Sequence, residues 1–216
     1  MNRNYTIISG RFETGIPEQK NAFMQLFGKE ETRNFFDLYF HWYNLVHEIG
    51  HCLVDQQEVS MSGVQEEMWV NRMAVAYFRC LHDKERLATL YRRLDMIVQA
   101  IPSPVPNNVT FETFYENIWE TERINDVMTY GYFQLNSILK ALNGKEDLER
   151  VLSEIGLSIK NAVAISPCQE PIDSEHAENH LTAAIKNMQR LGVNVPNISI
   201  RLVDDPSEQR VEYSEA

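Results

Sequence analysis

The sequence predicts a mainly α-helical fold with a small β-sheet, and three observations support this prediction. The chain has 216 residues, which suits one domain of ordinary size. Gly and Pro are sparse, at 9 and 8 residues, which favours long regular elements over a loop-rich β fold. Helical patterns fill most of the chain, whereas only two short segments have the character of strands.

The first half of the chain contains one predicted strand followed by three predicted helices. Pro is common at the first position of a helix and Gly just after its end, so Pro17 and Gly28 are expected to bound a short helix. In order, the predicted elements are a strand over residues 5–13 with a bend at Gly10, the helix from Pro17 to Gly28, a helix over residues 31–55, and a helix over residues 64–100 that bends near His82 and Asp83.

A proline-rich loop over residues 101–109 separates these helices from the second half of the chain. Its three prolines at alternate positions cannot continue a helix. The elements expected after it are a helix over residues 111–142 with Thr110 as N-cap, a helix over 146–164, a loop over 166–173, a helix from Ser174 to Leu191, and an alternating strand over 197–203. We expect a single domain over residues 1–205 and a disordered polar tail over residues 206–216.

Charge and cysteine content limit the classes of function. The formal net charge of −11 disfavours non-specific binding to nucleic acid and to anionic membrane surfaces. We see no secretory signal and no apolar stretch long enough to span a bilayer. The three cysteines are widely spaced, which is typical of reduced thiols. These features predict a cytoplasmic protein, and they leave its oligomeric state open.

The strongest chemical signal is the segment His47-Glu48-Ile49-Gly50-His51, an H-E-x-x-H motif. Two histidines four residues apart lie one turn from each other on a helix, so both imidazoles can bind a single zinc ion. Glu48 follows the first histidine and can reach a zinc-activated water without binding the metal. Polar residues at steps of three and four form one narrow stripe on this otherwise apolar helix, and a buried polar stripe needs partners. The alternative is a pair of core histidines bonded to neighbouring groups.

A catalytic zinc usually has three protein ligands, so a third ligand is expected downstream. The metzincin pattern requires Gly at position 54 and His at position 57, and Val54 and Gln57 exclude it. The next acidic pair is Glu66 and Glu67, of which only Glu67 has a polar residue, Asn71, one turn further on. Asn71 could accept a hydrogen bond from His47, as the partners of ligand histidines do. We therefore predict Glu67 as the third ligand and Asn71 as the partner of His47.

These residues resemble a known family. The H-E-x-x-H motif, followed by Glu67, Asn71 and Ala74, is similar to the ImmA/IrrE-like zinc metallopeptidases, whose second motif reads roughly E-x-x-A-N-x-F-A. Val70 and Met73 replace the usual Ala and Phe of that motif. The resemblance covers residues 45–80 and implies a zincin-like domain and a cytoplasmic endopeptidase that cleaves a peptide or protein, often a regulatory protein such as a repressor.

The expected chemistry is peptide-bond hydrolysis by a water activated on Zn²⁺, with Glu48 as general base. Mn, Fe or Co could occupy the same ligands. A second group usually helps to hold the oxyanion, and Tyr130, Tyr132 and His82 are candidate donors. Another pair spaced by four residues, His176 and His180, is expected on a solvated helix face.

Two other functions remain open for the same residues. The chain could be a zinc-dependent hydrolase of another small substrate, or a non-catalytic module that zinc stabilises for binding or sensing. Glu48 favours an enzyme, because a purely structural zinc site has no use for a carboxylate next to an open position.

Overall fold

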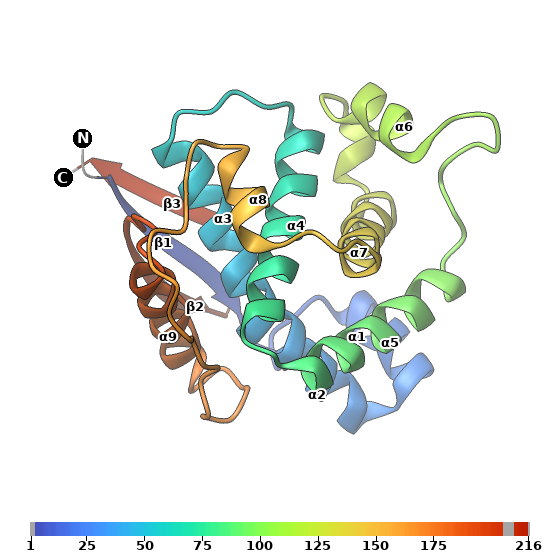
Figure 1. Cartoon of the computed structure of the whole chain (residues 1–216). Coiled ribbons are helices and arrows are strands. Elements are labelled where there is room, and N and C mark those ends of the chain that lie inside the picture. The colour runs from blue at the N-terminus through green and yellow to red at the C-terminus, as the bar shows by residue number, and fades with distance from the viewer. Residues whose placement is uncertain (1–2, 205–209, 216) are drawn as a thin grey trace.

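A computed structural model of the chain describes residues 3–204 and 210–215, and within them the fold is mainly α-helical with a small sheet, as predicted. Three strands form the sheet in the order β2-β1-β3. The central strand β1 (Arg3–Gly10) pairs in parallel with β2 (Asn197–Val203) and antiparallel with β3 (Arg210–Glu215). The sheet lies at one side of the molecule beside α3 and α9 (Figure 1).

Two predicted strands are confirmed, and the third corrects the prediction of a disordered tail. Residues 197–203 form β2, and the predicted first strand is β1, which begins earlier and ends at Gly10. Residues 210–215 form β3, although residues 206–216 were expected to be disordered; residues 205–209 and 216 lie outside the described part. The segment has only two apolar residues, Val211 and Tyr213, and this alternation is too short to predict a strand from sequence.

The helices of the N-terminal half follow the predicted order. They are α1 (Pro17–Phe27), α2 (Lys29–Leu38), a π-helix η1 (Tyr39–Tyr43), α3 (Asn44–Gln56), α4 (Gly63–Cys80) and α5 (Lys84–Ala100). The predicted helix over residues 31–55 is thus α2, η1 and α3 in succession. The bend expected near His82 is a full break between α4 and α5, where His82 has a positive φ of 56°.

The helices of the C-terminal half are shorter than predicted. They are α6 (Phe111–Ile118), the 3-10 helix η2 (Glu122–Asn125), α7 (Val127–Asn143), α8 (Leu148–Ser153) and α9 (Ala177–Arg190). The long helix expected over residues 111–142 is broken because the side chains of Thr121 and Asp126 cap new helix starts. The helix expected over 146–164 ends at α8, before Gly156 adopts a left-handed φ of 78°. The N-cap of α9 is His176 rather than Ser174.

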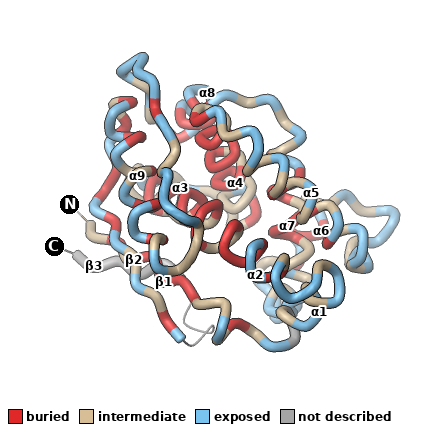
Figure 2. Tube along the Cα trace, turned by 90° about the horizontal axis from the view of Figure 1, so that it is seen from below, coloured by how far each residue is buried: buried red, intermediate tan, exposed pale blue. Residues whose placement is uncertain are grey.

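Helix α4 lies at the centre of the fold. It packs against α3 on one side and against α7, α8 and α6 on others. Buried residues gather along α3 and α4 (Figure 2). A capping box formed by Ser62 and Gln65 fixes the start of α4, and the indole N–H of Trp69 donates to the carbonyl of Val151 in the α8 segment. The N-terminal part of α4, which carries Glu66 and Glu67, is therefore held in a defined position beside α3.

Among the described residues, none of the helices is both long enough and apolar enough to cross a lipid bilayer.

Candidate metal centre

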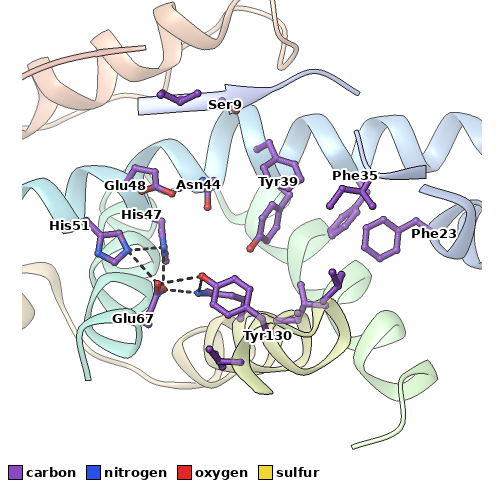
Figure 3. Close-up of a pocket in the computed structure, with 18 of the residues that line it drawn as sticks. Ser9, Phe23, Phe35, Tyr39, Asn44, His47, Glu48, His51, Glu67 and Tyr130 are labelled. Atoms are coloured by element: carbon purple, nitrogen blue, oxygen red, sulfur yellow. Dashed lines mark hydrogen bonds and ion pairs between the residues drawn. The ribbon is translucent and has the colours of Figure 1, made fainter. Parts of the chain in front are cut away.

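Three side chains from α3 and α4 converge on one point. The Nε2 atoms of His47 and His51 lie 3.2 Å apart. Oε2 of Glu67 lies 3.4 Å from Nε2 of His47, and Oε1 of Glu67 lies 3.7 Å from Nε2 of His51 (Figure 3). Ligand atoms about 2.0–2.1 Å from a shared tetrahedral zinc ion are roughly 3.3–3.5 Å apart. The three residues therefore have the spacing of a metal-ligand set, and they could hold a metal ion.

Both imidazoles are oriented by hydrogen bonds at their other nitrogen. Nδ1 of His47 lies 2.9 Å from Oδ1 of Asn71, and Nδ1 of His51 lies 2.7 Å from Oε1 of Glu66. Each oxygen is an acceptor, so each Nδ1 carries the proton and each Nε2 turns a lone pair toward Glu67. Two lone pairs and a carboxylate at such short distances need a positive charge between them, which a metal ion or a proton supplies.

The structure places Asn71 where the sequence predicts it and adds Glu66, whose role sequence reasoning missed. Asn71 is fully buried, and its Oδ1 also accepts a hydrogen bond of 2.9 Å from the hydroxyl of Tyr43. The spacing that selects Glu67 as a ligand excludes Glu66, because the residue four positions after Glu66 is the apolar Val70. The sequence signal for Glu66 is that it directly precedes Glu67. Of two successive acidic residues near a helix start, one can bind a metal with the histidines of the facing helix while the other accepts a hydrogen bond from one of these histidines.

The charges of the cluster depend on one another. Burial raises the pKa of Glu67, but the hydrogen bond to His47 and the charges of both histidines lower it more, to about 2. Burial lowers the pKa of His51, whereas the hydrogen bond to Glu66 and the charges of Glu67 and Glu48 raise it, to about 9. Without a metal ion, Glu67 is therefore ionised at neutral pH and a proton on His51 offsets its charge.

Helix α7 supplies a second set of contacts to Glu67. Nε2 of Gln134 donates to Oε2 of Glu67 at 2.7 Å and lies 2.8 Å from the hydroxyl of Tyr130. The Tyr130 hydroxyl in turn donates to Oε1 of Glu67 at 3.4 Å. Burial and the charge of Glu67 raise the pKa of Tyr130, so this hydroxyl keeps its proton at neutral pH. Gln134 has no sequence signal, because nothing in a single sequence links residues on α4 and α7.

Glu48 lies beside the three converging side chains and is not one of them. It lines the same cleft, and Nδ2 of Asn44 donates to its Oε1 at 2.9 Å. In Figure 3 Glu48 and Asn44 lie next to His47 along α3. One carboxylate is thus held near the cluster by an amide one helical turn away, which leaves its second oxygen available for a proton.

The structure brings Tyr130 to the site but not the other two candidate donors. Tyr132 packs against a separate apolar cluster formed by α6 and α7. His82 is exposed in the turn between α4 and α5. Neither residue lines the cleft, so neither can act there as an oxyanion donor. Tyr132 is turned away because it lies two residues after Tyr130 on a helix, about 200° around its axis.

The second histidine pair does not converge. Nδ1 of His176 lies 2.7 Å from Oδ1 of Asp173, and Nε2 of His180 lies 3.0 Å from the carbonyl oxygen of Pro171. His180 is buried, which corrects the expectation of a solvated face for this pair.

The metal-ligand cluster opens into a cleft of about 680 Å³. This volume is within the usual range of small-molecule and peptide sites, about 300–1,000 Å³. The walls come from β1, from the α1–α2–η1 segment, from α3, and from η2 and α7. Tyr39 and Phe40 of the π-helix lie on one wall, and π-helical turns occur frequently at functional sites.

No protein-family model, curated protein or solved structure significantly matches the chain.

Proposed function

We propose that the chain is a zinc-dependent peptidase in which His47, His51 and Glu67 hold the metal and Glu48 is the general base. The observation that carries this proposal is the convergence of the three ligand atoms at separations of 3.2, 3.4 and 3.7 Å, with Glu48 in the same cleft. Two histidines and one glutamate are a known ligand set of catalytic zinc, one that leaves the fourth position open.

Zinc is the proposed metal because of its donor set. Imidazole and carboxylate ligands suit zinc, and Mn, Fe or Co could bind the same side chains. When bound, zinc would act as a Lewis acid that makes a water molecule acidic enough to lose a proton near neutral pH.

Glu48 is the residue proposed to accept that proton. Its Oε1 is held by the Asn44 amide, so the carboxylate is oriented rather than free to rotate. The same carboxyl group would then carry the proton to the leaving amine, which needs no further acid. Glu48 therefore has a role that a structural zinc site would not require.

Tyr130 is the proposed oxyanion donor. Its hydroxyl keeps its proton at neutral pH and is fixed next to Glu67 by Gln134. In Figure 3 the hydroxyl points toward Glu67 from the wall opposite Tyr39. A protonated hydroxyl already oriented beside the metal ligands can stabilise developing negative charge without reorganisation.

The proposal is tested by metal analysis and hydrolysis on the same preparations. Wild type is expected to hold about one zinc per chain, and His51→Ala and Glu67→Ala are expected to lose it. Glu48→Gln is expected to keep zinc but to lose hydrolysis of a mixed peptide library read by mass spectrometry. His176→Ala is the matched control, because His176 contacts Asp173 and lies outside the cleft.

Two outcomes would overturn the proposal. If wild type holds no zinc after zinc is added, the proposed metal centre does not exist. Stoichiometric zinc with no hydrolysis of peptides by wild type would leave a non-catalytic zinc module or a hydrolase of another small substrate.

A further inference from the structure

The cleft has two chemically different ends. The metal ligands and Glu48 lie at one end, and aromatic side chains lie at the other (Figure 3). We call this second end, which is lined by Phe23 and Phe35, the apolar arm. Tyr39 and Tyr130 lie between the two ends on opposite walls (Figure 3).

Gly131, which lines the cleft from α7, is a glycine that the fold itself does not require. Glycine weakens the interior of a helix, so it usually has a packing or conformational reason. A Cβ atom on Gly50 would collide with Val70 and Met73 of α4, and one on Gly63 with Trp119. At Gly131 the same atom would meet nothing within 4 Å, and Gly131 does not have a positive φ.

We propose that Gly131 is a specificity-determining residue that keeps the cleft wide enough for a large aromatic or aliphatic side chain of the substrate to enter the apolar arm. This inference rests on the proposed function for the class of substrate, a peptide. A side chain at Gly131 would project into the open space of the cleft that it lines. Packing therefore does not require a glycine at position 131, whereas an open cleft does.

The side chains that line each end of the cleft determine which group of the substrate can bind there. Apolar surface gains free energy by being removed from water, so the apolar arm favours an apolar group. Val127, which lines the cleft one turn before Gly131, is also apolar and is 53% exposed. At the other end, the two charges of a zinc ion would face three carboxylates, Glu48, Glu66 and Glu67, so the centre disfavours a free carboxylate and suits an internal peptide bond.

The proposal is tested first by binding, which does not depend on turnover. The probes are two blocked hexapeptide amides that differ only in a central Phe or Ala, titrated into the metal-free and the zinc-loaded chain and followed by NMR. The Phe peptide is expected to bind roughly 10-fold or more tightly than the Ala peptide, the range that one apolar group supplies in a fitted pocket. Gly131→Leu and Gly131→Phe are expected to remove this preference, and Gly131→Ala to keep it.

Hydrolysis of the same two peptides by the zinc-loaded chain gives the second reading. Gly131→Leu is expected to lower kcat/KM for the Phe peptide by roughly 10-fold or more and to leave the Ala peptide nearly unchanged. Zinc content and the melting temperature show that the variants are folded and loaded. Equal binding of the two peptides by wild type, or an unchanged preference in both filled variants, would overturn the inference. Selective binding of the Phe peptide without any hydrolysis would instead overturn the proposed function, and the role of Gly131 in binding would remain supported.

Discussion

Gly50 of α3 lies so close to Val70 of α4 that a Cβ atom on Gly50 would come within 2.8 Å of Cγ1 of Val70. The contact lies between the two histidines of the cluster in sequence, three residues after His47 and one before His51. Glu67 lies on α4 one turn before Val70. The close approach at Gly50 therefore sets the distance between the two imidazoles of α3 and the carboxylate of α4, and this glycine contributes to the candidate metal centre through packing.

Gly50→Ala is expected to weaken both the fold and the metal centre. The added methyl group must displace Val70 or Met73, and overpacking of a core costs about 1–3 kcal/mol. Urea unfolding measures the loss of stability, and a zinc titration of the folded protein measures the loss of affinity. Gly131→Ala is the control: its methyl group meets open space, so it is expected to stabilise the chain by about 0.5–1 kcal/mol. A Gly50→Ala protein with unchanged stability and zinc affinity would contradict this role.

Asn71→Ala is expected to lower zinc affinity about 10- to 100-fold, because it removes the oxygen that orients His47. It also leaves the buried N–H of His47 without an acceptor, at about 1–3 kcal/mol. The Tyr43 hydroxyl loses its shorter hydrogen bond and keeps only the backbone carbonyl oxygen of Asn71, at 3.5 Å. Tyr43→Phe separates the two effects, since it removes one donor to Asn71 and keeps the contact with His47. If Tyr43→Phe lowers zinc affinity as much as Asn71→Ala does, the orienting contact is not the cause.

Glu66→Gln tests the second orienting contact with little change of shape. The amide oxygen can still accept from Nδ1 of His51, but the negative charge 2.7 Å away is lost. We expect zinc affinity to fall within the roughly 10- to 100-fold range known for such outer contacts and zinc stoichiometry to stay at one. Glu149→Gln is the control, because Glu149 is exposed on α8 and does not line the cleft. Isothermal titration calorimetry compares the zinc affinity of wild type, Glu66→Gln and the control. Equal affinities would show that the charge of Glu66 does not contribute to zinc binding.

The sequence predicts the convergence of His47, His51 and Glu67 well because the information is local. The spacing of His47 and His51 needs only helix geometry, and Glu67 and Asn71 share one face of the next helix. The polar stripe that continues upstream is also explained: Nδ1 of His41 contacts Asp37 at 2.8 Å, and its Nε2 contacts the carbonyl oxygen of Gly10 at 3.0 Å. Polar residues on a buried helix need hydrogen-bond partners, and both His41 and His47 have them in the structure.

The sequence does not predict the walls of the cleft, because they join elements far apart in the chain. Gln134 and Tyr130 reach Glu67 from α7, more than sixty residues away, and no pattern in one sequence pairs them. The extent of α6 and α7 is mispredicted for a related reason. Apolar residues continue through 111–142, but the side chains of Thr121 and Asp126 bond to backbone N–H groups and start new helices.

Removal of the metal is expected to lower the melting temperature and to leave the helices folded. Away from His47 and Asn71, the interface of α3 and α4 contains fully buried apolar residues, with Ile49, Leu53 and Met73 all at 0% exposure, so the helices do not depend on the metal for their core. Zinc at 100 times its Kd would stabilise the native state by about 2.7 kcal/mol. For a chain of this size, that corresponds to a shift of roughly 5–11 °C.

Differential scanning calorimetry with and without a chelator measures this shift, and circular dichroism follows the helices. Glu67→Ala is expected to show no shift with zinc, because its third ligand is missing, whereas His176→Ala should behave as wild type does. Loss of the helical signal on chelation would mean that the metal is required for folding and would favour a structural site. A shift that survives Glu67→Ala would mean that zinc binds elsewhere, because the remaining two imidazoles make a weak site by themselves.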